Sequence, residues 1–177
     1  MNDMALQDWY VLQVMAGREK EIAEKLKAAG IRACAPEREV NVIRRGQWRR
    51  ETRLFFDGYV FICCQYNADI YHTAKKITGV VKILPDALHP VPLHSHEADF
   101  IKICSRGVIG LHDVIRHGDR YEIADGELAG FKGKLVMVRP RQRKAILKMD
   151  VCGHIRLVSI GINHIKVSLK KSEVKSG

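Results

Sequence analysis

The sequence predicts an α+β domain followed by a smaller domain built only of strands. Strand-like and helical apolar patterns alternate through residues 1–104, whereas residues 121–177 contain short apolar runs separated by glycines and no helical period. The net charge changes as well. Residues 1–104 have fifteen Lys/Arg and thirteen Asp/Glu, whereas residues 121–177 have twelve Lys/Arg and five Asp/Glu. The glycine-containing segment 105–120 has the composition of a linker. We therefore expect two domains, 1–104 and 121–177, joined by that linker.

The first strand and helix are indicated by their residue patterns. Trp9–Met15 is aromatic and β-branched, which favours a strand. Arg18–Ala29 carries Ile22 and Leu26 on one helical face, and Gly30 suits the position just after a helix. A strand followed by an amphipathic helix is therefore expected.

The remainder of the first domain is predicted to be a mostly antiparallel sheet with its helices on one side. Gly46 separates two polar runs, which predicts a hairpin. Asn67 and Ser95 are expected to cap two further helices, because short polar side chains accept hydrogen bonds from the first free amides. The other strands are expected at Ile31–Ala35, Arg38–Arg45, Gln47–Phe55, Tyr59–Gln65 and Val80–Leu84.

The second domain is predicted to be a small β-barrel, since several short strands lie close together between turn residues. Gly161 is interpreted as a turn between the last two strands. The five expected strands are Arg120–Ala124, Lys134–Arg139, Ala145–Met149, Ile155–Ile160 and His164–Leu169.

The net charge of +10 indicates a polyanionic partner, most commonly nucleic acid. A membrane surface is the weaker alternative, because the chain has no long apolar run. No signal peptide is visible, and the five cysteines are odd in number, so we expect buried free thiols and a cytoplasmic protein.

No catalytic or cofactor motif is visible, so the sequence predicts a protein that is not an enzyme and carries no cofactor. His94 and His96 are too few ligands for a zinc site, and no metal is expected.

A basic cluster marks the second domain as a candidate nucleic-acid surface. Four cations fall within residues 139–144 without an acid among them, which is best explained by phosphate neutralisation, although a solvated loop is the alternative. The hairpin around Gly46 is a second candidate, through Arg44, Arg45, Arg49 and Arg50. The candidate RNA-binding residues of the second domain are Lys132, Lys134, Arg139, Arg141, Arg143, Lys144, Lys148 and Arg156.

An aromatic cluster in the first domain allows two interpretations. In the segment Phe55–Phe61, an Asp-Gly turn leads aromatic side chains into a strand. These side chains are either core residues or, together with Trp9 and Tyr10, a shallow apolar depression that receives a partner helix.

Four motifs in order resemble the NusG family. The Trp9–Tyr10 strand with its following helix is similar to the start of the family's N-terminal (NGN) domain, and Phe55–Phe61 is similar to its F-P-G-Y-V-F signature, with Asp57 where proline is usual. The strand at residues 79–84 matches the following G-V strand, and Asp125–Gly133 resembles the start of a KOW motif in an SH3-like β-barrel.

This resemblance implies a transcription elongation factor whose NGN domain binds the clamp helices of RNA polymerase and suppresses pausing. His72 and Thr73 resemble part of a motif that contacts the opposite side of the polymerase cleft in the RfaH branch, although its third residue is missing. The polymerase-docking residues implied by position are Trp9, Tyr10, Gln13, Phe56, Tyr59 and Phe61.

The basic second domain is most similar to the LoaP branch, which implies a monomeric antitermination factor whose KOW domain binds a leader RNA hairpin. The alternative is a factor whose NGN hairpin reads DNA and whose KOW domain recruits a protein, Rho or the ribosome. A ribosome-associated RNA-binding protein is a third possibility, but it leaves the aromatic motif unexplained.

Overall fold

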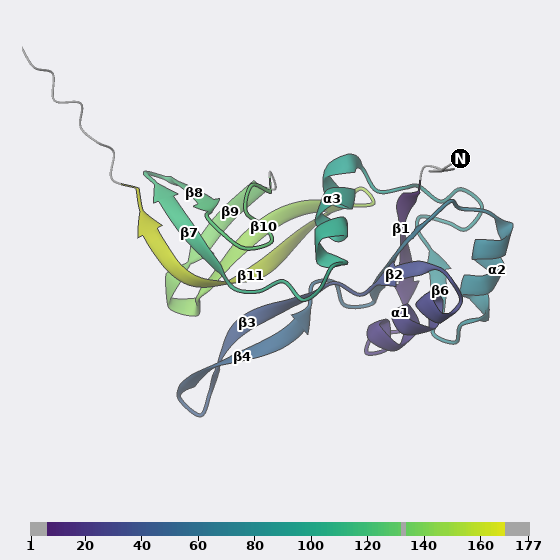
Figure 1. Ribbon diagram of the computed structural model, residues 1–177, viewed down its shortest axis with the longest axis horizontal. Coiled ribbons are helices and arrows are strands. Elements are labelled where there is room, and N and C mark those ends of the chain that lie inside the picture. Colours follow the sequence, from purple (N-terminus) through teal and green to yellow (C-terminus); the bar gives the residue numbers. More distant parts are fainter. Residues whose placement is uncertain (1–6, 132–133, 169–177) are drawn as a thin grey trace, which may run out of the picture.

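The computed structural model describes residues 7–131 and 134–168 and contains two main sheets with helix α3 between them (Figure 1). The first is an antiparallel four-stranded sheet in the order β2-β5-β1-β6. Its elements, with the helices in chain order, are β1 (Asp8–Val14), α1 (Glu19–Ala28), β2 (Arg32–Cys34), β5 (Tyr59–Cys64), α2 (Ala68–Lys76), β6 (Val80–Ile83) and α3 (Ser95–Cys104).

The two faces of this sheet are covered by different elements, because side chains alternate along a strand. One face, which includes Leu12 and Ile62, packs on Ile22 and Leu26 of α1 and on α2. The other face packs against α3 and the second sheet, with Phe61 fully buried. The predicted α+β class is confirmed, but the prediction that the helices lie on one side is wrong, since α1 and α2 cover one face of the sheet and α3 the other.

Of the two predicted helix caps, the structure confirms one. The side chain of Asn67 accepts a hydrogen bond of 3.0 Å from the Ile70 amide, as predicted for α2. The prediction of Ser95 as the cap of α3 is wrong, since Ser95 is already helical and His94 precedes the helix. The His94 amide donates to the Glu97 carboxylate at 3.0 Å, so an acidic side chain in the first turn binds the free amide instead.

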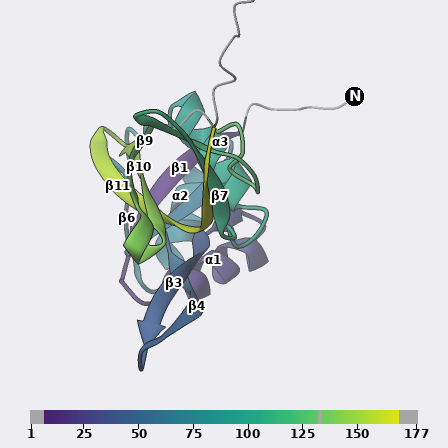
Figure 2. The same cartoon turned by 90° about the vertical axis from the view of Figure 1, so that its left-hand side faces the viewer.

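A separate hairpin is formed by β3 (Glu37–Arg44) and β4 (Gln47–Leu54). Both turn residues, Arg45 and Gly46, have positive φ, of 52° and 76°, as two-residue hairpin turns of the favoured twist require. The hairpin projects from the rest of the molecule (Figure 2), and its strand β3 contacts the second sheet. It therefore connects the two halves of the molecule.

The second sheet has five strands in the order β8-β7-β11-β10-β9. Strand β7 lies within the predicted linker, so that prediction is wrong for its second half: the polar run pairs in parallel with β11 and antiparallel with β8. Among the described residues no ladder joins the edge strands β8 and β9. The bounds are β7 (His112–His117), β8 (Arg120–Ile123), β9 (Lys134–Arg139), β10 (Lys144–Val151) and β11 (His154–Val167).

Gly161 lies inside one continuous strand, which corrects the prediction of a turn between two strands. A Cβ at Gly161 would lie 2.2 Å from Leu111 Cδ2 and 2.8 Å from the Glu39 carbonyl oxygen. The glycine is therefore needed because the backbone of β3 passes close to β11 here. A close approach of another backbone is a common reason for a glycine within a strand.

A continuous apolar cluster joins the two halves of the chain. Phe100 of α3 packs 5.2 Å from Phe55 on one side and 5.3 Å from Phe131 on the other, measured between ring centres. The cluster continues into Leu147 and Ile160 of the second sheet. The second sheet thus packs against α3 and the aromatic face of the first.

Candidate protein-docking and nucleic-acid surfaces

The aromatic residues implied in docking lie largely on one face of the four-stranded sheet. In the β1–β5 ladder Gln13 is opposite Tyr59, and the same face carries Trp9 and Phe61. Trp9 is 5% exposed and Phe61 is 0% exposed, and Phe56 is buried beside them. The interpretation of these three aromatics as core residues fits this arrangement, and only Gln13 and Tyr59 are partly exposed.

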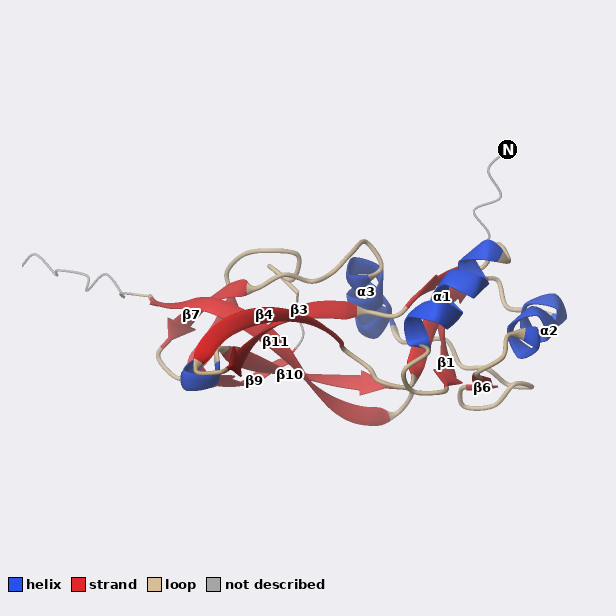
Figure 3. Ribbon diagram, turned by 90° about the horizontal axis from the view of Figure 1, so that it is seen from below, coloured by secondary structure: helices blue, strands red, loops and turns tan. Residues whose placement is uncertain are grey.

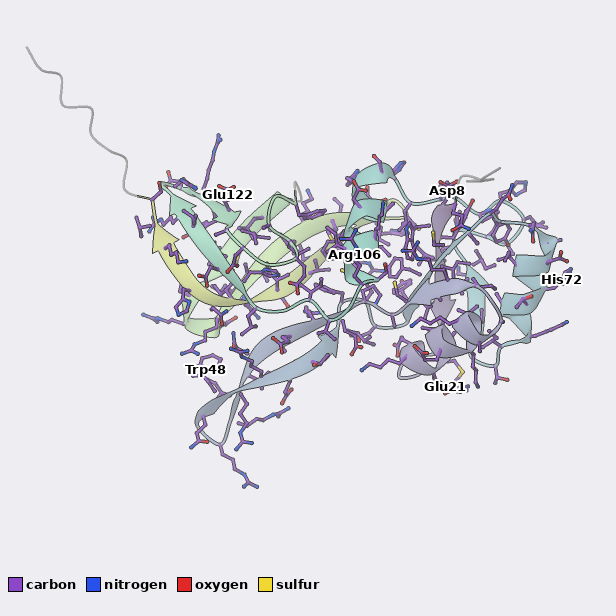
Figure 4. The ribbon with its side chains drawn as sticks, in the orientation of Figure 1. Asp8, Glu21, Trp48, His72, Arg106 and Glu122 are labelled. Carbon is purple, nitrogen blue, oxygen red and sulfur yellow. The ribbon has the colours of Figure 1, made fainter. Side chains whose placement is uncertain are left out.

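Three other residues implied in docking lie elsewhere. Tyr10 points to the opposite face of the sheet, where its ring packs 5.3 Å from that of Tyr66. His72 and Thr73 lie on α2, far from the second sheet (Figure 4). The structure therefore does not bring all of the implied docking residues to one surface.

The second sheet contacts Tyr59 directly. Arg156 of β11 donates a hydrogen bond of 3.0 Å to the Tyr59 hydroxyl. Arg156 is thus separated from the other cations predicted to bind RNA. Its strand neighbour opposite is the buried Met149 rather than a cation.

Arg139, Lys144 and Lys148, three of the other cations predicted to bind RNA, lie on the solvent-facing side of the second sheet. Residues 144, 146, 148 and 150 of β10 alternate with buried ones, so Lys144 and Lys148 point outward. The strand partner of Lys144 is the exposed Arg139, and that of Lys148 is Lys134. Lys132 lies outside the described residues.

A 3-10 turn at one end of this face adds two more exposed cations. The turn, Pro140–Gln142, includes Arg141 and is followed by Arg143, which has a left-handed φ of 48°. No ion pair within the described ranges involves Arg139, Arg141, Arg143, Lys144 or Lys148. These charges are therefore available to an external anion.

The hairpin arginines are divided between two faces. Arg44 bonds the Glu51 carboxylate at 2.8 Å, which keeps the pKa of that carboxyl below its usual value. Arg49 and Arg50 are neighbours on β4 and therefore point to opposite faces. Arg45 lies in the exposed turn.

Trp48 and Asn41 belong to the same region but are absent from the predicted site. Trp48 is 37% exposed, and its ring centre lies 4.8 Å from the guanidinium carbon of Arg143. Asn41 donates to the Ile162 carbonyl at 3.0 Å. The position of Trp48 between arginines is a sequence signal that indicates a nucleic-acid contact. The Asn41 contact has no such signal, because it joins residues that are distant in the chain.

The cysteines have the properties of structural thiols rather than nucleophiles. All five are free, and burial raises the pKa of Cys34 to about 12 and that of Cys64 to about 11. Within the described residues, no helix is long and apolar enough to cross a membrane.

Comparisons with known proteins agree with the fold. Residues 7–102 match the family described as "Transcription termination factor nusG". The chain is 26% identical over 174 residues to the transcription termination/antitermination protein NusG of Pseudomonas aeruginosa, covering 89% of this chain and 97% of that protein. It is 27% identical over 154 residues to NusG of Streptococcus pyogenes serotype M1, covering 80% of this chain and 86% of that protein.

A solved structure described as "Domain interaction in Thermotoga maritima NusG" has a similar fold, with a TM-score of 0.53 at 22% identity. The similarity covers 88% of this chain and 94% of that one, so it includes the β-rich C-terminal region.

Proposed function

The chain belongs to the NusG family of transcription termination and antitermination factors, which are not enzymes, and we propose that it is a processive antitermination factor of the LoaP type. Its first domain docks on the clamp helices of RNA polymerase, and its basic second domain binds a hairpin in the leader RNA. It acts as a cytoplasmic monomer.

The observation that carries the RNA assignment is the set of cations on one side of the second sheet. Arg139, Lys144 and Lys148 extend from adjacent strands, and Arg141 and Arg143 extend from the turn at their end. Cations that neutralise phosphates release bound counterions, which makes such a surface favourable for a polyanion. A-form RNA hides its bases in a deep groove, so phosphates and unpaired nucleotides are the groups that this surface contacts.

Polymerase docking involves the face that carries Gln13 and Tyr59. Because the second sheet contacts this face through Arg156, docking of a helix pair here requires the β10–β11 end of that sheet to move away. The buried aromatics Trp9 and Phe61 then support the surface from below. His72 on α2 contacts the opposite side of the polymerase cleft.

The two domains of this proposal follow the sequence limits, 1–104 and 121–177, with β7 added to the second. The five-stranded sheet forms an SH3-like KOW barrel in this proposal, and its edge strands β8 and β9 contact each other without a ladder among the described residues.

A second candidate function is favoured by the outer face of the hairpin. Arg45 and Arg49 are exposed and have no ion pair among the described residues, which suits a DNA backbone. In that case the KOW domain recruits a protein, and the exposed Ile155 and Leu157 of β11 are the contact residues.

The RNA assignment is tested with the full chain and a fluorescein-labelled RNA stem-loop in an anisotropy titration. Replacing Arg141, Lys144 and Lys148 with alanine is expected to weaken binding at least about tenfold and to reduce the salt slope by about two to three. The matched control replaces Lys75, Lys76 and Lys82 of the first domain, which removes the same charge elsewhere. Equal losses in both variants would reduce the binding to net charge and contradict the assignment.

A further inference from the structure

The two basic segments that the sequence offers as separate nucleic-acid candidates lie against each other in the structure. The short helical turn at Pro140–Gln142 lies beside the far end of the β3–β4 hairpin (Figure 3). Arg143, which follows the turn, lies over the ring of Trp48 at 4.8 Å. The two elements are almost a hundred residues apart in the chain but form one continuous surface.

We propose that this surface, made of Trp48 and Arg50 from the hairpin and Arg141, Arg143 and Lys144 from the second sheet, binds a single RNA stem-loop from both sides. The proposal rests on the RNA-binding function above and extends it, because it assigns part of the RNA site to the first domain. An unpaired loop nucleotide stacks beside Trp48, and the cations on either side bind its flanking phosphates.

The backbone of Arg143 is fixed by the contact between the two elements. Its carbonyl oxygen accepts hydrogen bonds from the Ile162 amide at 3.0 Å and from the Asn41 side chain at 3.3 Å. Its own amide donates to the Pro140 carbonyl at 3.0 Å. A non-glycine residue in the left-handed region costs energy and persists where its surroundings hold it, and such positions are frequent at binding sites. The backbone that carries the guanidinium is therefore fixed before any ligand arrives, and the guanidinium itself lies over the Trp48 ring.

The register of the hairpin decides which of its arginines belongs to this surface. Trp48 is opposite Ile43 and Arg50 is opposite Asn41, so these four side chains share one face of the ladder. At the far end of the hairpin, Asn41 bonds the Ile162 carbonyl and Trp48 lies against Arg143, so this face meets the second sheet there. Arg49 is opposite Val42 and points to the other face. Arg50 is thus part of the surface, whereas its neighbour Arg49 is not.

The chemistry of the surface favours an RNA with an unpaired base. A half-exposed indole offers a stacking platform that every base can use, and a guanidinium already lies over it. Protein recognition of RNA mostly targets loops and bulges, where bases stack on aromatic and arginine side chains. A fully paired duplex has no free base for Trp48, so it would use the cations alone.

The pair Arg49 and Arg50 supplies a matched test, because both are exposed arginines on the same strand. The full chain is titrated with a labelled RNA stem-loop, of about ten base pairs and about six loop nucleotides. We expect Arg50→Ala to weaken binding about fivefold and Trp48→Ala about tenfold, with Arg49→Ala within about twofold of the unchanged chain. Arg143→Gly, which keeps the left-handed backbone, is expected to match Arg50→Ala.

Tryptophan fluorescence gives a second readout that does not depend on a variant. The chain has two tryptophans, and Trp9 is buried. RNA that stacks on Trp48 is therefore expected to quench the fluorescence of the more exposed tryptophan. A blunt RNA duplex without a loop is expected to bind through the cations without that quenching.

The outcomes separate this proposal from the one on which it rests. Suppose that Arg50→Ala and Trp48→Ala bind RNA as Arg49→Ala does, while the triple alanine variant of the second sheet binds RNA more weakly. The shared surface of hairpin and second sheet is then refuted, and RNA binding by the second domain stands. If the triple variant also keeps its affinity, the RNA-binding function itself fails. A DNA stem-loop of the same sequence that binds as tightly as the RNA would overturn the choice of RNA.

Discussion

The guanidinium of Arg156 in β11 donates a hydrogen bond of 3.0 Å to the hydroxyl of Tyr59 in β5 and lies 5.6 Å from the centre of its ring. Tyr59 and its strand neighbour Gln13 are the exposed part of the face proposed to dock on polymerase. The contact therefore places a residue of the second sheet on that face.

Removal of this contact is expected to increase binding to polymerase. An exposed cation–π contact contributes about 0.5–1 kcal/mol, so Arg156→Ala should favour separation and lower the Kd by about two- to fivefold. Biolayer interferometry with immobilised bacterial core RNA polymerase measures this. Lys148→Ala, which removes an exposed cation from the same sheet, is the control and should leave the Kd unchanged.

The docking face itself is tested by Tyr59→Ala in the same assay. Tyr59 is partly exposed, so its loss is less damaging to the fold than replacement of the fully buried Phe61. We expect weaker polymerase binding even in the presence of Arg156→Ala. A double variant that binds as well as Arg156→Ala alone would show that docking uses another surface.

The crossing of β11 over β3 at Gly161 predicts a large cost for any side chain there. A Cβ would approach the Glu39 carbonyl oxygen to 2.8 Å, and backbone cannot move aside as easily as a flexible side chain. Gly161→Ala is expected to lower the free energy of unfolding by about 1–3 kcal/mol in urea titrations. Gly107→Ala, whose Cβ would meet nothing within 4 Å, serves as the control and should cost far less.

Gly161 also illustrates where sequence reasoning stops. A glycine between two apolar runs is locally consistent with a turn, and only the approach of β3 makes it part of a long strand. The strand within residues 105–120 was missed for a similar reason, because its polar run is stabilised by pairing with β11. Elements whose signal is local, such as the hairpin at Gly46 and the helix after Asn67, were predicted correctly.

In the candidate site, too, only the features that depend on local sequence could be predicted. Clustering of Arg139, Lys144 and Lys148 follows from the period of two along strands, which the sequence contains. The separation of Arg156 from that cluster and the contact between Trp48 and Arg143 depend on how distant elements pack. No local pattern encodes such contacts.

The junction of β7 and β11 predicts a loss of stability in acid. Asp113 of β7 bonds Lys166 of β11 at 2.8 Å and the ring of His164 at 3.1 Å, and these hydrogen bonds, first that of Lys166, hold the pKa of the Asp113 carboxyl below its usual 3.8. A carboxyl with a lowered folded-state pKa stabilises the fold above its unfolded pKa and loses that effect as the pH falls through the folded pKa. The same pair raises the pKa of Lys166 above 10.5, so the contribution is also lost in strong base.

Asp113→Asn is therefore expected to lower the melting temperature by a few degrees at pH 7, where the ion pair is complete. The difference from the unchanged chain should shrink as the pH falls below 3.8, because protonation of Asp113 then removes the same charge. Thermal unfolding followed by circular dichroism at several pH values measures this. Asp119→Asn, in the exposed turn between β7 and β8, is the control for the loss of one negative charge. A difference between Asp113→Asn and the unchanged chain that persists unaltered into acid would mean that packing of residue 113, rather than its charge, holds β7 against β11.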